Sequence, residues 1–236
     1  MRTTAFVTAL GTALGLVIPP AAATWPGSNG LLVFAGCRLE CEDTGTGMDL
    51  FTSRSDGSDR RRITDDAGWE TSPQWSPDGS KVLFTCHGTG RVDDTDQEIC
   101  VVGADGTGWT ELTDNAEQED HANWSPDGSQ VVFVRGSEDV SDLYVMNADG
   151  TDERQLTLDR WGAGNPAWSP DGDWIAYISG SRDDDSDVYR IPPQGGDRER
   201  LTSTKTSETT PSWSPDGARI LFSRYDRQED RCRSGA

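Results

Sequence analysis

The sequence predicts an all-β protein, a β-propeller of about five four-stranded blades. The pentapeptide Trp-Ser-Pro-Asp-Gly occurs four times, at intervals of 49, 44 and 45 residues. Each copy is followed by the same order of short apolar segments and turns, and four short strands in about 45 residues are typical of one propeller blade. Nine Trp, 26 Gly and 12 Pro in 236 residues indicate a packed core with many turns.

The first 23 residues differ from the rest of the chain. Arg2 precedes an uncharged, mainly apolar run from Ala5 to Ile18, and residues 19–23 (Pro-Pro-Ala-Ala-Ala) follow it. This pattern predicts a signal peptide at 1–23. A membrane anchor is the alternative, but the apolar run is shorter than the ~20 residues that a spanning helix needs. We therefore expect an exported protein, periplasmic or extracellular, whose mature part is residues 24–236.

The repeat defines the elements of each blade in order. The Trp ends an inner strand, and a second strand follows with apolar residues seven to nine positions after it, as in Val82, Leu83 and Phe84. A strand that is apolar on both faces is covered on both sides, as it is between two neighbouring blades. A third strand begins with an acid and an aliphatic residue (Glu98-Ile99), an Asp-Gly turn comes next, and a fourth strand ends in Leu-Thr or Ile-Thr.

These landmarks place the blades at about 24–66, 67–115, 116–159, 160–204 and 205–236, and the last blade is incomplete. The chain therefore predicts either a five-blade ring or a truncated six-blade propeller. An open ring would expose Leu32 and Phe34 at one end and Ile220 and Phe222 at the other, so self-association through the open ends is also expected. The repeated tryptophans are interpreted as core between blades: Trp75, Trp124, Trp168 and Trp213.

The same motifs resemble the TolB-like (WD-repeat-like) β-propeller repeat over about residues 25–232. The resemblance implies a propeller fold, and it leaves activity open because propellers serve binding, scaffolding and catalysis. Compared with TolB, the motifs predict a propeller without the N-terminal α/β domain and with a shortened C-terminus.

The net charge of −20 excludes nucleic acid and anionic membranes as favoured partners, since both would be repelled. The loops between the second and third strands are acidic in every blade. We expect one face of the propeller to attract a cationic protein or peptide, although a solubilising rim would have the same composition. The residues proposed for partner binding in these loops are Asp93, Asp94, Asp96, Asp183, Asp184 and Asp185.

A second group of candidate residues lies just before the inner strands, near the propeller axis. Glu70, Glu119 and Glu208 occupy equivalent repeat positions, so their side chains could converge at the channel mouth together with Asp120, His121 and Asn165. Such oxygen ligands would suit Ca²⁺, and hydrated channel lining is the alternative. No other cofactor is predicted.

Five cysteines in an exported chain favour disulfides. Cys86 and Cys100 lie on adjacent strands of one predicted hairpin, so we expect a bond between them. Cys37 and Cys41 are predicted to form a smaller bridge, which leaves Cys232 unpaired.

No catalytic motif is present: the sequence has no Gly-x-Ser-x-Gly elbow, and its only histidines are His87 and His121. The sequence therefore predicts an exported, non-enzymatic propeller that binds a protein or peptide on an acidic face. The alternative is a metal-assisted hydrolase or lyase that acts on polysaccharide through the axial carboxylates and His121.

Overall fold

The structure is a computed structural model that describes residues 30–37, 47–65, 68–87, 96–137, 140–158, 160–180 and 185–225. These residues form strands β1 to β17 and contain no helix, so none of them forms a helix that could cross a membrane. The predicted signal peptide at 1–23 lies outside them. The strands build five separate antiparallel sheets, which we call the first to fifth blades, and this confirms the all-β propeller.

The second, third and fourth blades each have four strands in sequence order. They comprise β4 (Trp69–Trp75), β5 (Lys81–His87), β6 (Glu98–Gly103) and β7 (Thr110–Glu111); β8 (Glu119–Trp124), β9 (Gln130–Ser137), β10 (Val140–Asn147) and β11 (Arg154–Gln155); and β12 (Ala163–Trp168), β13 (Ile175–Gly180), β14 (Ser186–Ile191) and β15 (Glu199–Arg200).

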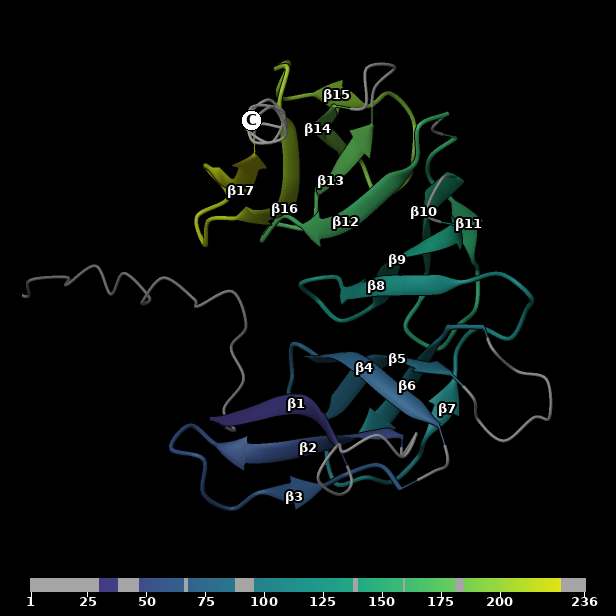
Figure 1. The fold of residues 1–236 in the computed structure, drawn as a ribbon, viewed down its shortest axis with the longest axis vertical. Coiled ribbons are helices and arrows are strands. Elements are labelled where there is room, and N and C mark those ends of the chain that lie inside the picture. The colour runs from purple at the N-terminus through teal and green to yellow at the C-terminus, as the bar shows by residue number, and fades with distance from the viewer. Residues whose placement is uncertain are drawn as a thin grey trace, which may run out of the picture.

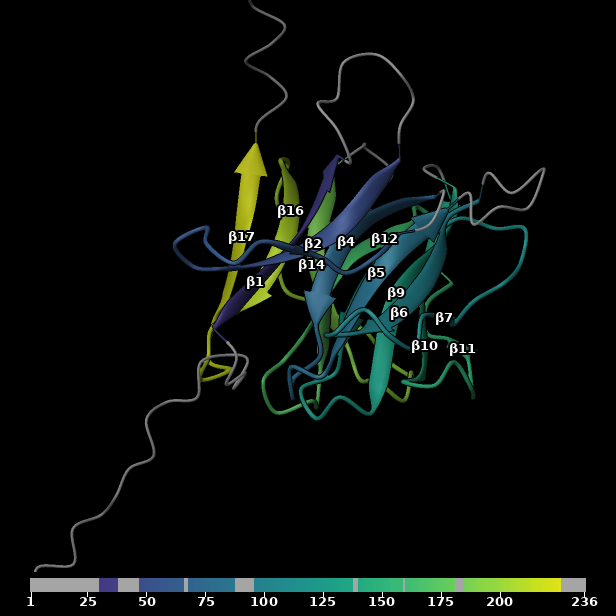
Figure 2. The same ribbon diagram turned by 90° about the horizontal axis from the view of Figure 1, so that it is seen from below.

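The two end blades have fewer described strands. The first contains β1 (Leu31–Cys37), β2 (Met48–Arg54) and β3 (Arg61–Arg62), and the fifth contains β16 (Ser207–Trp213) and β17 (Ile220–Tyr225). Figure 1 shows the blades in an arc, with β8 and β12 on its inner side and the short strands β3, β7, β11 and β15 on its outer side. Figure 2, seen from below, places both end blades on the same side of the molecule. No described strand joins them.

The core consists of apolar layers between consecutive blades. Leu83 of the second blade packs with Trp124 and Phe133 of the third, whereas Val82 and Phe84 pack with Leu50 of the first. The middle strand of the second blade is thus covered on both faces, as its sequence predicts. Trp124 lies within one of these layers, and Trp75 and Trp168 pack against two others.

The Ser-Pro-Asp-Gly segments form tight turns with side-chain support. The Ser76 hydroxyl donates to Asp78 Oδ1 at 2.6 Å and accepts from the Lys81 amide at 2.9 Å, and Gly79 adopts a positive φ of 70°. The Ser76 hydroxyl closes the turn, while glycine supplies a conformation that other residues adopt at a cost.

Each inner strand of the second to fifth blades contains a β-bulge. The register shifts between Thr71 and Gln74 in β4, and equivalent shifts occur in β8, β12 and β16. A bulge re-aims the side chains beside it and commonly lies next to functional sites.

Candidate functional site

The bulges place four polar residues, which we call the axial residues, at the same point of four consecutive inner strands. Each adopts a left-handed backbone conformation, with φ between 49° and 53°: Ser72, His121, Asn165 and Thr210. Ser72, His121 and Thr210 are exposed, and Asn165 is half-buried. Residues other than glycine rarely adopt this conformation, and such backbone strain is concentrated at functional sites.

His121 is paired with the neighbouring carboxylate of Asp120. Its Nδ1 lies 3.3 Å from Asp120 Oδ2, and half of its side chain is exposed. Asp120 Oδ1 accepts hydrogen bonds from the His121 amide and, at 3.0 Å, from the Thr85 hydroxyl of the second blade. The carboxylate therefore orients the imidazole ring through Nδ1, and Nε2 remains the atom with which the ring can meet a ligand.

A chain of amide hydrogen bonds supports the inner strands. Gln74 Nε2 donates to Asn123 Oδ1 at 2.9 Å, and Asn123 Nδ2 donates to the Pro166 carbonyl at 3.1 Å. These bonds join the second, third and fourth blades close to the axial residues. Sequence patterns do not predict these bonds, because each partner lies more than 40 residues from the next.

The three glutamates expected at the channel mouth are buried instead. Glu70, Glu119 and Glu208 are at most 1% exposed, so the prediction that they converge there or reach a partner is wrong. Each occupies a corner between two blades, where a third strand begins, a fourth strand ends and the next inner strand starts. Hydroxyl or amide groups from the loop before it bond to each carboxylate.

The Leu-Thr and Ile-Thr landmarks explain how these corners are built. In each corner the threonine hydroxyl accepts a hydrogen bond from the backbone amide that directly follows the acid of the third strand, from Leu50, Ile99, Leu143 and Val188 in turn. The sequence indicated only a strand end at this motif. The hydroxyl oxygen thus accepts from a buried backbone amide, and the hydroxyl group can also donate a hydrogen bond to an acid. Thr64 donates in this way to Glu70 at 3.0 Å.

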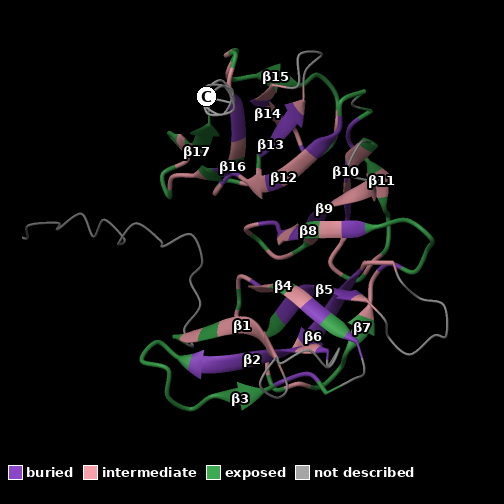
Figure 3. Ribbon diagram, viewed as in Figure 1, coloured by how far each residue is buried: buried purple, intermediate pink, exposed green. Residues whose placement is uncertain are grey.

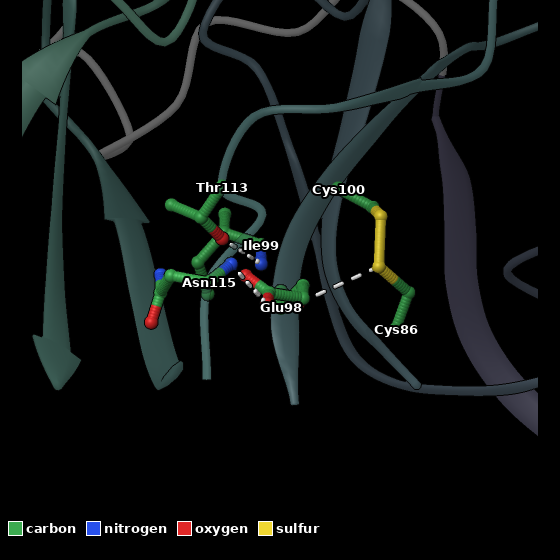
Figure 4. Close-up of a disulfide and its surroundings, with 6 residues drawn as sticks. All are labelled: Cys86, Glu98, Ile99, Cys100, Thr113 and Asn115. Carbon is green, nitrogen blue, oxygen red and sulfur yellow. Dashed lines mark hydrogen bonds between the residues drawn. A yellow bond between two sulfur atoms is a disulfide. The ribbon is translucent and has the colours of Figure 1, made fainter. Parts of the chain in front are cut away.

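The second corner, between the second and third blades, holds two buried carboxylates. Glu98 is 2% exposed and Glu119 is fully buried. Burial raises the pKa of Glu98 to about 8, and the neighbouring Glu119 carboxylate acts in the same direction. Glu98 Oε1 accepts from the Asn115 amide at 2.9 Å (Figure 4). Arg135 Nε lies 2.5 Å from Glu119 Oε1.

The predicted disulfide between Cys86 and Cys100 is confirmed, with Cα atoms 5.9 Å apart (Figure 4). Cys37 is also disulfide-bonded, and its predicted partner Cys41 lies outside the described residues, as does Cys232. Among the described residues, one group of three metal-ligand side chains occurs, Cys86, Cys100 and Glu111. Two of its three members are joined as a disulfide, so they do not offer thiolate ligands.

The acidic loops are described only in part. Asp96 and Asp185 are half-buried, whereas Asp93, Asp94, Asp183 and Asp184 lie outside the described residues. The opposite face also carries acids, in its Ser-Pro-Asp-Gly and Asp-Gly turns. Several of these accept hydrogen bonds within their own turns, among them Asp78, Asp105, Asp127, Asp149, Asp171 and Asp216. Acidic groups therefore lie on both faces.

A cavity of about 620 Å³ opens on this turn face between the second and third blades. Lys81, Asp105 and Asp149 line it together with backbone of the two blades. Similar but smaller hollows lie beside the Ser-Pro-Asp-Gly turns of the second to fourth blades, so they follow from the repeat.

The blades, their turns and their bulged inner strands define a β-propeller built from repeats of about 45 residues. The model of the TolB beta propeller domain matches residues 106–234, and the chain belongs to this family. A search of curated proteins found no match.

Solved structures share the fold. TolB from Acinetobacter baumannii is 20% identical with a TM-score of 0.66, and the match covers 82% of this chain and 46% of that one. An oligogalacturonate lyase in complex with manganese is 22% identical with a TM-score of 0.65, covering 83% of this chain and 59% of that one. A puromycin-hydrolyzing peptidase of Mycobacterium tuberculosis is 16% identical with a TM-score of 0.59, covering 88% and 38%. This chain thus spans about half the length of TolB.

Proposed function

We propose that this protein is an exported propeller that binds a protein or peptide partner at its axial face. The observation that carries the proposal is the row of axial residues, four polar side chains held in strained conformations at equivalent points of four blades. The fold itself requires only a bulge there. The side chains are accessible and differ from blade to blade, as expected for a surface that contacts an asymmetric ligand.

The partner's contacting segment is cationic in this proposal. Asp120 lies beside His121 at the axial face of the third blade. Asp185 belongs to the loop before β14 of the fourth blade, on the same face of the propeller. A net charge of −20 favours encounter with a basic segment. The loop acids Asp93, Asp94, Asp96, Asp183 and Asp184 are part of the same proposal.

An oligolysine peptide is a suitable probe for this charge preference. We expect Asp120→Asn/Asp185→Asn to weaken peptide binding roughly tenfold at low salt, because the proposed face loses two negative charges. Calorimetry measures the affinity. The matched control is Asp173→Asn/Asp197→Asn, which removes the same charge from the opposite face. Equal weakening by both pairs would mean that only net charge matters, and the proposed face would be wrong.

A metal-assisted lyase or hydrolase acting on polysaccharide is the second candidate. The pairing of Asp120 with His121 Nδ1 favours it, because carboxylates orient metal-binding imidazoles in this way. A similar fold occurs in an oligogalacturonate lyase in complex with manganese. If polygalacturonate is cleaved with added Mn²⁺ and His121→Ala abolishes both cleavage and bound metal, the enzyme function replaces the binding function.

Self-association through the open ends is also proposed. Leu32 is 53% exposed and Leu221 is 76% exposed, although Val82 and Leu83, at the equivalent positions of the second blade, are fully buried. Figure 3 shows β17 largely exposed, in contrast to β13. A second copy that stacks the fifth blade of one chain on the first blade of another would cover both surfaces.

A further inference from the structure

The four corners between blades share a pattern of interactions that can be compared within this one chain. In each, an acid lies at or near the start of the third strand, and a residue of the fourth strand pairs with the position two residues after that acid. A third residue is the first or second of the next inner strand, and it pairs with a fourth residue on the strand after that. In that order the corners contain Asp49, Arg62, Glu70 and Cys86; Glu98, Glu111, Glu119 and Arg135; Asp142, Gln155, Ala163 and Ser179; and Asp187, Arg200, Glu208 and Arg224.

Three corners give the first acid a donor from the fourth strand. Arg62 contacts Asp49 at 2.8 Å and Arg200 contacts Asp187 at 2.5 Å. In the third corner Gln155 Nε2 donates to Asp142 at 3.0 Å. The fold therefore uses this fourth-strand position to satisfy the buried acid.

The second corner breaks the pattern because Glu111 occupies the donor position. Its one arginine, Arg135, contacts Glu119 and Glu153 at 2.5 Å and Glu117 at 3.8 Å. Among the described residues, Glu98 has no ion-pair partner. The Oε2 atoms of Glu98 and Glu119 are both buried and lack a hydrogen-bond partner.

We propose that Glu98 and Glu119 bind one shared proton, and that loss of this proton loosens the contact between the second and third blades. The proton bonded to one Oε2 is donated to the other Oε2, which satisfies both orphaned atoms with a single hydrogen bond. Without it, two neighbouring carboxylates would both be charged in a buried site where Arg135 contacts Glu119 but not Glu98, which is unfavourable.

The other charged groups around the pair are mostly acidic. Glu111 comes from β7, Asp114 and Glu117 from the following loop, Asp120 from β8, Asp142 from β10 and Glu153 from the loop before β11, and Arg135 of β9 is the cation. Hydrogen bonds to Glu153 and Glu119 raise the pKa of Arg135 despite its burial, so it remains charged. These acids oppose ionisation of a second carboxylate in the corner.

The direction of the pH effect follows from the raised pKa of Glu98. The folded protein holds this proton up to about pH 8, whereas the unfolded chain releases it at a pKa near 4.5. The group therefore stabilises the fold fully below the unfolded pKa, and this contribution is lost as the pH rises through the folded pKa. Asp120 follows Glu119 directly and bonds to Thr85 across the same two blades, so the axial pair Asp120–His121 would shift with the corner.

The test is the pH profile of the thermal midpoint in the full chain, from about pH 6 to about pH 9.5. The unmodified protein should lose roughly 5 °C over this range through Glu98. Glu98→Gln should remove that slope, because its amide donates to Glu119 at every pH. Glu111→Arg should also remove it, because it supplies the cation that Arg62 and Arg200 supply elsewhere. Asp187→Asn is the matched control from the fourth corner and should lower the midpoint without changing its slope.

Infrared spectroscopy gives a readout of the proton itself. The band of a protonated carboxylic acid should disappear between about pH 7 and pH 9 and be absent in Glu98→Gln. An unchanged slope in Glu98→Gln, or the absence of that band in the unmodified protein at pH 7, would overturn the proposal. A third result would also overturn it: at pH 9, added Ca²⁺ raises the thermal midpoint of the unmodified protein but not that of Glu98→Gln. The pair would then bind a cation and not a proton.

Discussion

The disulfide between Cys86 and Cys100 allows a quantitative test of how the second blade is held. We expect Cys86→Ala/Cys100→Ala to lower the free energy of unfolding by about 3 kcal/mol, because a sequence separation of 14 closes a loop for which the chain-entropy model gives that value. For a chain of this size the thermal midpoint should fall by about 6–12 °C. Both sulfur atoms are buried, so some lost packing adds to the effect.

Urea unfolding without reductant measures this difference. Cys37 is also disulfide-bonded, so adding dithiothreitol to the double variant isolates the contribution of that second bond. Reduction of the unmodified protein should then lower its stability by the sum of both effects. If the variant unfolds within about 1 kcal/mol of the unmodified protein at the same m-value, the loop is already constrained in the unfolded state, and the entropy argument fails.

Three further results are expected. Gly106→Ala should destabilise the protein more than Gly57→Ala does in urea unfolding. Both glycines have a positive φ, but only a Cβ at Gly106 would lie 2.8 Å from a backbone oxygen of the neighbouring blade. Equal losses of stability would contradict this. Leu221→Glu should shift light scattering toward monomer if the open ends associate, and an unchanged mass would remove that proposal. Turn hydrogen bonds lower the pKa of Asp78 to about 2, so its stabilising effect is lost as pH falls from about 4 to 2. Asp78→Asn should therefore lose its stability difference from the unmodified protein over that range in acid unfolding.

The sequence was sufficient to predict the blades because local patterns determine them. Trp-Ser-Pro-Asp-Gly contains its own turn chemistry, and the double-faced apolar strand around Leu83 is explained only by cover on both sides. The Cys86–Cys100 bond followed from placing both residues in one hairpin. These features depend on residues close together in the chain or on exact repetition.

The interpretation of the glutamates failed because equivalent positions in a repeat do not show whether a side chain is buried or exposed. Glu70, Glu119 and Glu208 are equivalent, but the side chains beside the bulges, such as His121, are the accessible ones. The bulge changes the strand geometry after the glutamate, and strand alternation alone does not predict it. The proximity of Glu98 and Glu119 was also missed, because the two belong to different blades.

Repetition within the chain separates what the fold requires from what differs between blades. The turn serine and the corner threonine recur with the same contacts in blade after blade, so they maintain the scaffold. The axial residues change at every blade, and His121 with Asp120 occurs only in the third. The second corner, where Glu111 replaces a donor, lies between the second and third blades, and Thr85 bonds to Asp120 across those same blades. Proton loss at Glu98 should therefore weaken binding at His121 over the same pH range in which it destabilises the fold.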